Sequence, residues 1–167
     1  AAYNNLGLIL KAQGNFEGAI SCFRKAIDID PMSAQAYSNL GTIYFSLRQL
    51  DLALDVYLKA VGISPMDSIA QYNLGLVRKD LGHFEDALAC FEKALTIEPG
   101  FSQALNNAGI TLNKLGRSKE AISKFEIAVD ADSENSDACY NLGKLLEDVC
   151  DWKKLDAVLD LIDRQTR

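Results

Sequence analysis

The sequence predicts an all-α fold, an α-solenoid of about five helix hairpins stacked side by side. Two observations carry this prediction. A pattern of small, aromatic and apolar residues recurs every 34 residues along the 167-residue chain. Within each period, two segments with helical apolar spacing are separated by a short turn. One such hairpin cannot bury its own apolar face, so neighbouring hairpins must stack to form a continuous core.

Columns of the repeat give each helix its role. The first column is glycine: Gly7, Gly41, Gly75, Gly109 and Gly143. The second is mainly alanine: Ala19, Ala53, Ala87 and Ala121, then Leu155. The third is mainly aromatic: Phe23, Tyr57, Phe91 and Phe125, then Leu159. We expect the small residues to let the two helices approach closely, with the aromatic ring filling the space beside them.

The repeats are expected at 1–33, 34–67, 68–101, 102–135 and 136–167, with the first and last incomplete. In the third repeat we expect Ser68 to cap a first helix that ends at Gly82. A second helix is expected from about Phe84 to Ile97, stopped by Pro99. Proline closes the first three repeats (Pro31, Pro65 and Pro99), and Ser133 takes its place in the fourth.

The second helix of the fifth repeat differs from its counterparts because it is apolar around much of its circumference. It carries Trp152, Leu155, Val158, Leu159, Leu161 and Ile162. A terminal helix facing water should be polar outside. We therefore expect either a following segment that covers it or self-association through the terminal repeats. Since Ala1 already lies inside the pattern, we expect the chain to be a piece of a longer protein.

Composition excludes several function classes. The net charge is −6 and no basic stripe is visible, which argues against a nucleic-acid partner. No apolar run is long enough to span a membrane and no signal peptide is present. A cytoplasmic location is expected from the cysteines, which show no sign of disulfide pairing. The four cysteines (Cys22, Cys90, Cys139 and Cys150) are expected to be reduced thiols filling small packing sites. No catalytic set, phosphate-binding loop or ligand cluster is visible, so we expect no enzyme activity, cofactor or metal.

A polar residue recurs two positions before each glycine. This column is Asn5, Asn39, Asn73, Asn107 and Asn141. At about 100° per residue, it lies roughly 200° from the face that meets the second helix. We call this column the asparagine ladder and expect it to line a groove. The residues expected beside it form a partly apolar column, Leu8, Thr42, Leu76 and Ile110, then Lys144, with Tyr72 next to Asn73.

An amide side chain offers both donors and an acceptor, as a peptide backbone requires. Helices pack roughly 8–10 Å apart and an extended chain rises about 3.3 Å per residue. One asparagine could therefore contact a ligand backbone about every third residue. The ladder predicts that an extended peptide or partner segment binds in the groove. The alternative is that the amides hydrogen-bond neighbouring repeats and have a structural role.

These columns closely resemble those of tetratricopeptide repeat proteins. The second repeat matches throughout, with Tyr37, Leu40, Gly41, Tyr44, Ala53, Tyr57, Ala60 and Pro65. The fourth departs at Ala108 and Ser133, and the fifth loses the alanine and aromatic columns. The resemblance implies a right-handed superhelix of helix pairs with the first helices lining a concave groove. It also implies a non-catalytic module that binds peptides or partner proteins.

Two narrower resemblances lead to different expectations. Members of one subclass, which capture a C-terminal carboxylate, carry basic residues at set groove positions. The corresponding positions here (Ala1, Gln35, Ile69, Gln103 and Asp137) are not basic, so such a clamp is not expected. The string 149–152 resembles the junction that precedes the catalytic domain in the O-linked N-acetylglucosamine transferase family. The alternative function is therefore a substrate-recruiting arm of a larger glycosyltransferase or other transferase.

Overall fold

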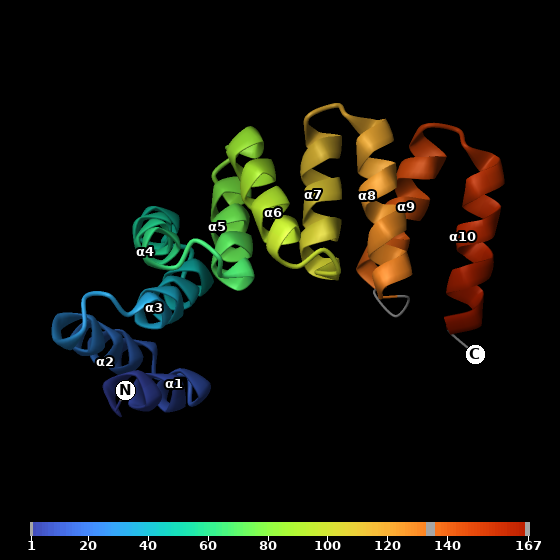
Figure 1. Cartoon of the computed structure of the whole chain (residues 1–167). Coiled ribbons are helices and arrows are strands. Elements are labelled where there is room, and N and C mark those ends of the chain that lie inside the picture. The colour runs from blue at the N-terminus through green and yellow to red at the C-terminus, as the bar shows by residue number, and fades with distance from the viewer. Residues whose placement is uncertain (1, 133–135, 166–167) are drawn as a thin grey trace. The chain divides into compact units, whose positions relative to one another are not determined.

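The structure, a computed structural model, describes residues 2–132 and 136–165, except for the side chains of residues 157 and 160–165. The described chain is helical and contains no strand. Its helices are α1 (Ala2–Ala12), α2 (Phe16–Ile29), α3 (Ala34–Ser46), α4 (Leu50–Ile63), α5 (Ser68–Asp80), α6 (Phe84–Ile97), α7 (Ser102–Lys114), α8 (Ser118–Ala131), α9 (Ser136–Asp148) and α10 (Trp152–Gln165). This succession of hairpins confirms the predicted α-solenoid (Figure 1).

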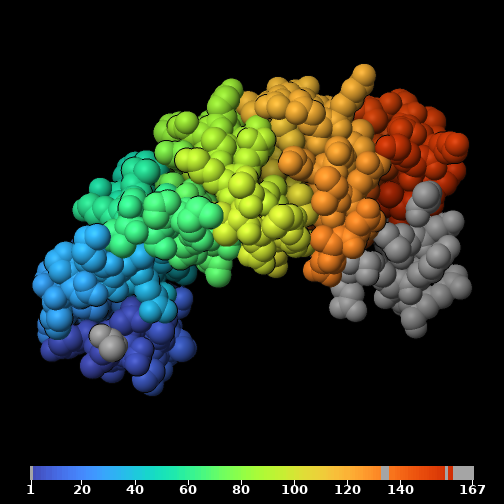
Figure 2. Space-filling view, in the orientation of Figure 1, coloured from blue at the N-terminus to red at the C-terminus, as the bar shows by residue number. Residues whose placement is uncertain are grey.

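The helices form two compact units, which divide after Gly82. In unit 1, α1 packs on α2 and α3 on α4, while α2 also contacts α3 and α4 contacts α5. In unit 2, α7 packs on α8 and α9 on α10, while α6 contacts α7 and α8 contacts α9. In the space-filling view, coloured segments that are neighbours in sequence lie in contact within each unit (Figure 2). The handedness of the predicted superhelix stays a prediction.

The α1–α2, α3–α4 and α7–α8 hairpins each close by placing an aromatic ring against a glycine. A Cβ atom added to Gly7 would lie 2.6 Å from the Phe23 ring. The same atom on Gly41 would lie 2.8 Å from the Tyr57 ring, whereas real Cβ atoms do not approach so closely. The alanines opposite, such as Ala19 and Ala53, are fully buried. This arrangement confirms the packing expected from the glycine, alanine and aromatic columns.

A second apolar face of each first helix packs against the preceding hairpin. On α3, Leu40 and Ile43 are 3% and 1% exposed. The corresponding residues of α1, Leu6 and Ile9, are 45% and 55% exposed, because no hairpin precedes α1 in the described chain. The two faces share their residue types and differ only in whether a neighbour covers them.

Two local predictions were wrong. Asp67, not Ser68, caps α5, because the Asp67 side chain accepts a hydrogen bond of 3.0 Å from the Ala70 backbone N–H. The Asp67 backbone is extended, which leaves its carboxylate facing the first turn. Cys150 is exposed and packs against no core, whereas Cys22, Cys90 and Cys139 are buried as expected.

The last helix is only partly described. Trp152 and Leu159 are 57% and 50% exposed, and Val158 is buried. The side chains of Leu161 and Ile162, and all of Ser133, lie outside the described residues. Self-association through the terminal repeats therefore stays a prediction. No helix in the described part of the chain is both long and apolar enough to cross a membrane.

Candidate functional site

The ladder asparagines lie at equivalent positions on the first helices of successive hairpins. Asn5, on α1, is exposed. The other four are half-buried: Asn39 on α3, Asn73 on α5, Asn107 on α7 and Asn141 on α9. The apolar column beside them, formed by Leu8, Thr42, Leu76 and Ile110, is half-buried as well. Each described unit therefore presents amides together with a partly accessible, mostly apolar strip.

Two ladder amides bond to the preceding repeat. Asn39 Nδ2 donates to Asn4 Oδ1 at 3.0 Å, which links α3 to α1. Asn141 Nδ2 donates to Asn106 Oδ1 at 3.0 Å, which links α9 to α7. The inter-repeat hydrogen bond expected from the structural alternative is therefore present at two of the ladder positions. Each of these amides keeps its carbonyl oxygen and one N–H hydrogen for other partners.

The remaining ladder positions behave differently. Asn107 Nδ2 donates within its own helix, to the Gln103 carbonyl at 2.9 Å. Asn5 and Asn73 make no side-chain hydrogen bond to any described residue. The five amides thus share a position in the repeat and differ in their partners.

Two hydroxyl groups beside the ladder also have defined roles. Thr42 Oγ1 donates to the Ser38 carbonyl at 3.0 Å and lies 3.2 Å from the Tyr57 hydroxyl. Since the threonine hydrogen is already used, the Tyr57 O–H donates to Thr42. Burial raises the pKa of Tyr57, and burial also raises the pKa of Tyr72, which is half-buried. Both phenols therefore stay protonated across the physiological range.

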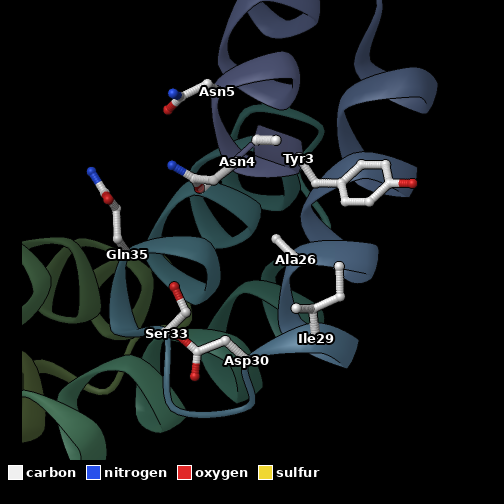
Figure 3. A pocket seen from close by; sticks show the side chains of 9 residues that line it. Tyr3, Asn4, Asn5, Ala26, Ile29, Asp30, Ser33 and Gln35 are labelled. Atoms are coloured by element: carbon white, nitrogen blue, oxygen red, sulfur yellow. The ribbon is translucent and has the colours of Figure 1, made fainter.

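A pocket of 390 Å³ opens in unit 1 beside the start of the ladder. Asn4, Asn5 and Gln35 line it together with Ala26, Ile29, Asp30 and Ser33. Figure 3 shows the three amide groups on one side of the pocket, while the Tyr3 ring points to the opposite side. The pocket therefore joins amide donors and acceptors to an apolar wall formed by Ala26 and Ile29.

A smaller pocket of 190 Å³ lies between α7 and α9 in unit 2. It is lined by Ile110 of the apolar column and Asn141 of the ladder, with Lys144 and Asp148 from α9. Both pockets contain a ladder residue, and the pocket in unit 1 also contains Asn4, the residue that precedes the ladder.

Sequence reasoning missed Asn4 and Asn106, and it considered Gln35 only as a position that lacks a basic residue. A signal for the first two was present, because the pairs Asn4-Asn5 and Asn106-Asn107 double the ladder residue in the first and fourth repeats. Among the residues that the structure describes, no group of His, Cys, Asp or Glu is placed to hold a metal ion. The chemistry offered by these surfaces is hydrogen bonding by amides next to apolar contact.

Models of one repeat family match most of the chain. The TPR repeat model matches residues 7–47 and 41–82. Tetratricopeptide repeat models match residues 68–101 and 90–123. A comparison with curated protein sequences gave no significant match.

Several solved structures share the fold over nearly the whole chain. MamA from Desulfovibrio magneticus RS-1 is 19% identical with a TM-score of 0.89, and the match covers 99% of this chain and 94% of that one. The Pseudomonas aeruginosa protein pilF is 25% identical with a TM-score of 0.87, over 98% of this chain and 75% of that one. YrrB, described as a TPR protein with an unusual peptide-binding site, is 26% identical with a TM-score of 0.77, over 98% and 82%. The chain belongs to the tetratricopeptide repeat family.

Proposed function

We propose that this chain is a protein-protein interaction module that binds an extended peptide or partner segment along its asparagine ladder. The observation that carries the proposal is the amide at the same position of each first helix. On α1, α3, α5 and α7 it stands next to a half-buried and mostly apolar column. The family supports a role in binding proteins, and the similar protein YrrB is described as having a peptide-binding site.

The chemistry of the ladder suits main-chain recognition. A peptide bond carries one N–H donor and one carbonyl acceptor, and an amide side chain can pair with both. Asn5 and Asn73 have no described partner, and Asn39 keeps its carbonyl oxygen. The apolar strip formed by Leu8, Thr42 and Leu76 lies beside them and would contact alternate ligand side chains.

The proposal is tested by replacing three ladder residues together, as Asn39→Ala, Asn73→Ala and Asn107→Ala. The probe is a peptide selected from a phage-displayed library of random 12-residue peptides, labelled and followed by fluorescence polarisation. Each lost main-chain hydrogen bond contributes about 0.5–1.5 kcal/mol. We therefore expect binding at least about tenfold weaker, with an unchanged far-ultraviolet circular dichroism spectrum.

A matched control places three alanines on the second helices, as Asp28→Ala, Lys93→Ala and Ser123→Ala. These residues are exposed, and the set leaves the net charge unchanged. The control should bind the selected peptide like the parent chain. The proposal fails if no library peptide binds, or if the ladder variant binds as tightly as the control. Loss of helical signal in the ladder variant alone would show that the amides have a structural role.

The alternative, a substrate-recruiting arm of a larger transferase, stays a prediction. The matches to family models and solved structures above are to repeat proteins and give it no support. The gene sequence that follows the codon for Arg167 tests it directly. A transferase domain there would support the alternative, and a stop codon would remove it.

A further inference from the structure

The asparagine ladder is supported by a second, shorter set of amides one position earlier in the repeat. Asn4 and Asn106 are each 7% exposed, so they are among the few buried polar side chains of the described chain. Each accepts a hydrogen bond of 3.0 Å from the ladder residue of the following repeat, Asn39 or Asn141. Because a buried amide oxygen without a partner is unfavourable, these bonds are expected to persist in the free protein.

The second repeat shows what happens when this supporting amide is absent. Ser38 occupies the position of Asn4, and its Oγ is buried without a hydrogen-bond partner among the described residues. A serine oxygen stands one bond closer to the backbone than an asparagine Oδ1, and no hydrogen bond to Asn73 forms. Asn73, the ladder residue of the following repeat, accordingly has no described side-chain partner. Within unit 1, Asn39 is therefore held by its neighbour and Asn73 is not.

We propose that Asn4 and Asn106 are positioning residues, which make Asn39 in unit 1 and Asn141 in unit 2 the preorganised contacts of the groove. The inference rests on the proposed function and specifies which ladder atoms contact the main chain of the ligand. While Nδ2 bonds to the buried oxygen, a flip of the ladder amide alone would bring two carbonyl oxygens together and is unfavourable. Asn39 and Asn141 therefore present their carbonyl oxygen as a fixed acceptor for a main-chain N–H of an extended peptide.

In each unit, one member of the hydrogen-bonded amide pair lines a pocket. Asn4 lines the pocket of 390 Å³ with Asn5 and Gln35, and Figure 3 shows these amides gathered on one side. Asn141 lines the pocket of 190 Å³ together with Ile110. Fixing a side chain before binding removes an ordering cost of about 0.5–1.5 kcal/mol, which corresponds to roughly a 2- to 10-fold change in affinity.

A loss variant and a gain variant test the inference within unit 1. Asn4→Ser copies the residue of the second repeat and removes the partner of Asn39. Ser38→Asn copies the residue of the first repeat and supplies a partner to Asn73. We expect Asn4→Ser to weaken binding of the selected library peptide by about 2- to 10-fold and Ser38→Asn to strengthen it by a similar factor.

A spectroscopic readout separates positioning from simple stability. In ¹⁵N-labelled protein, the side-chain N–H resonances of Asn39 should exchange with water faster in Asn4→Ser, and those of Asn73 should exchange more slowly in Ser38→Asn. A peptide N-methylated at the contacted residue should bind weakly and should no longer distinguish Asn4→Ser from the parent. Unchanged Asn39 side-chain exchange in Asn4→Ser would overturn the inference.

The outcomes also separate this inference from the proposed function. If the triple ladder variant loses the peptide while both single variants bind like the parent chain, the positioning role is wrong and the proposed function stands. If the triple variant also binds like the parent chain, or no library peptide binds, both are wrong. A loss of unfolding stability in Asn4→Ser that fully accounts for its weaker binding would overturn the positioning role as well.

Discussion

The fourth hairpin (α7–α8) and the fifth (α9–α10) have the same arrangement of two helices, but their two helices are packed together by different residues. In the α7–α8 hairpin, Phe125 is 2% exposed, and its ring would lie 2.6 Å from a Cβ atom on Gly109. In the α9–α10 hairpin, a Cβ atom on Gly143 would first meet Leu155 and Val158, each at 3.8 Å. Only a glycine at position 109 leaves room for the Phe125 ring, whereas a side-chain methyl group at position 143 would make ordinary van der Waals contacts.

The missing ring leaves a pocket. A cavity of 310 Å³ lies between α9 and α10, lined by Gly143, Leu155 and Leu159 with Cys139 and Tyr140. Leu155 and Leu159 stand where the other repeats have an alanine and an aromatic residue. Two leucines do not replace the ring, and Leu159 remains 50% exposed. The comparison teaches that the aromatic residue, more than the glycine, closes this type of hairpin.

The largest expected effect comes from removing the ring. Phe125→Ala leaves a buried cavity and should lower the free energy of unfolding by about 3–5 kcal/mol. Leu159→Ala, at the same column but half-exposed, should lower it by only about 1 kcal/mol. Urea unfolding followed by circular dichroism at 222 nm measures both. Equal losses for the two variants would show that the α9–α10 hairpin is as tightly closed as α7–α8.

The single tryptophan of the chain adds local information to that measurement. Trp152 is the first residue of α10, so its fluorescence reports this helix while the circular dichroism signal reports all helices. Because stability in a repeat protein is nearly a sum of local terms, α10 can separate before the rest unfolds. We expect Leu159→Ala to shift the fluorescence transition more than the circular dichroism transition.

The second effect concerns the glycines themselves. Gly109→Ala places a methyl group against the Phe125 ring and should destabilise the protein by about 1–3 kcal/mol. Gly143→Ala meets no close atom and should stabilise it by about 0.5–1 kcal/mol, because alanine restricts the unfolded chain and favours a helix. Thermal and urea unfolding of the pair measure the difference in sign. A destabilised Gly143→Ala variant would mean that the cavity beside Gly143 closes in solution.

Much of the fold could be predicted from the sequence because the same residue types recur at the packing positions of several repeats. The column of Gly7, Gly41 and Gly109 identified the helix contact, and the segment 84–97 was recognised as a helix, as the structure confirms. Capping at α5 was harder, since Asp67 and Ser68 are both good N-cap residues and the choice depends on backbone angles.

The candidate site could be predicted less completely. The ladder is visible as a column, but its partners depend on which side chain the neighbouring repeat contributes. Asn4 and Ser38 occupy the same column and differ in whether their oxygen reaches the next helix. The residue pattern within one repeat does not predict this hydrogen bond, because the bond joins residues of two successive repeats. The burial of Asn4 and Asn106 therefore became apparent only in the structure.

The smallest expected effect lies in the turns of the same two hairpins. Gly116, which follows α7, has φ 74°, and Cys150, which follows α9, has φ 58°. This left-handed conformation is free for glycine and costs other residues about 1–2 kcal/mol. Cys150→Gly should therefore stabilise the protein by up to about 1 kcal/mol, since glycine also adds freedom to the unfolded chain.

The matched variant is Gly116→Ala, which should destabilise the protein by about 1 kcal/mol because it introduces the same strain into α7–α8. No atom lies within 4 Å of a Cβ atom added to Gly116, and Cys150 is exposed, so packing contributes little to either change. Urea midpoints by circular dichroism measure both. If Cys150→Gly leaves the midpoint unchanged while Gly116→Ala lowers it, the turn after α9 relaxes out of the left-handed region, and the looser closure of the α9–α10 hairpin extends to its turn.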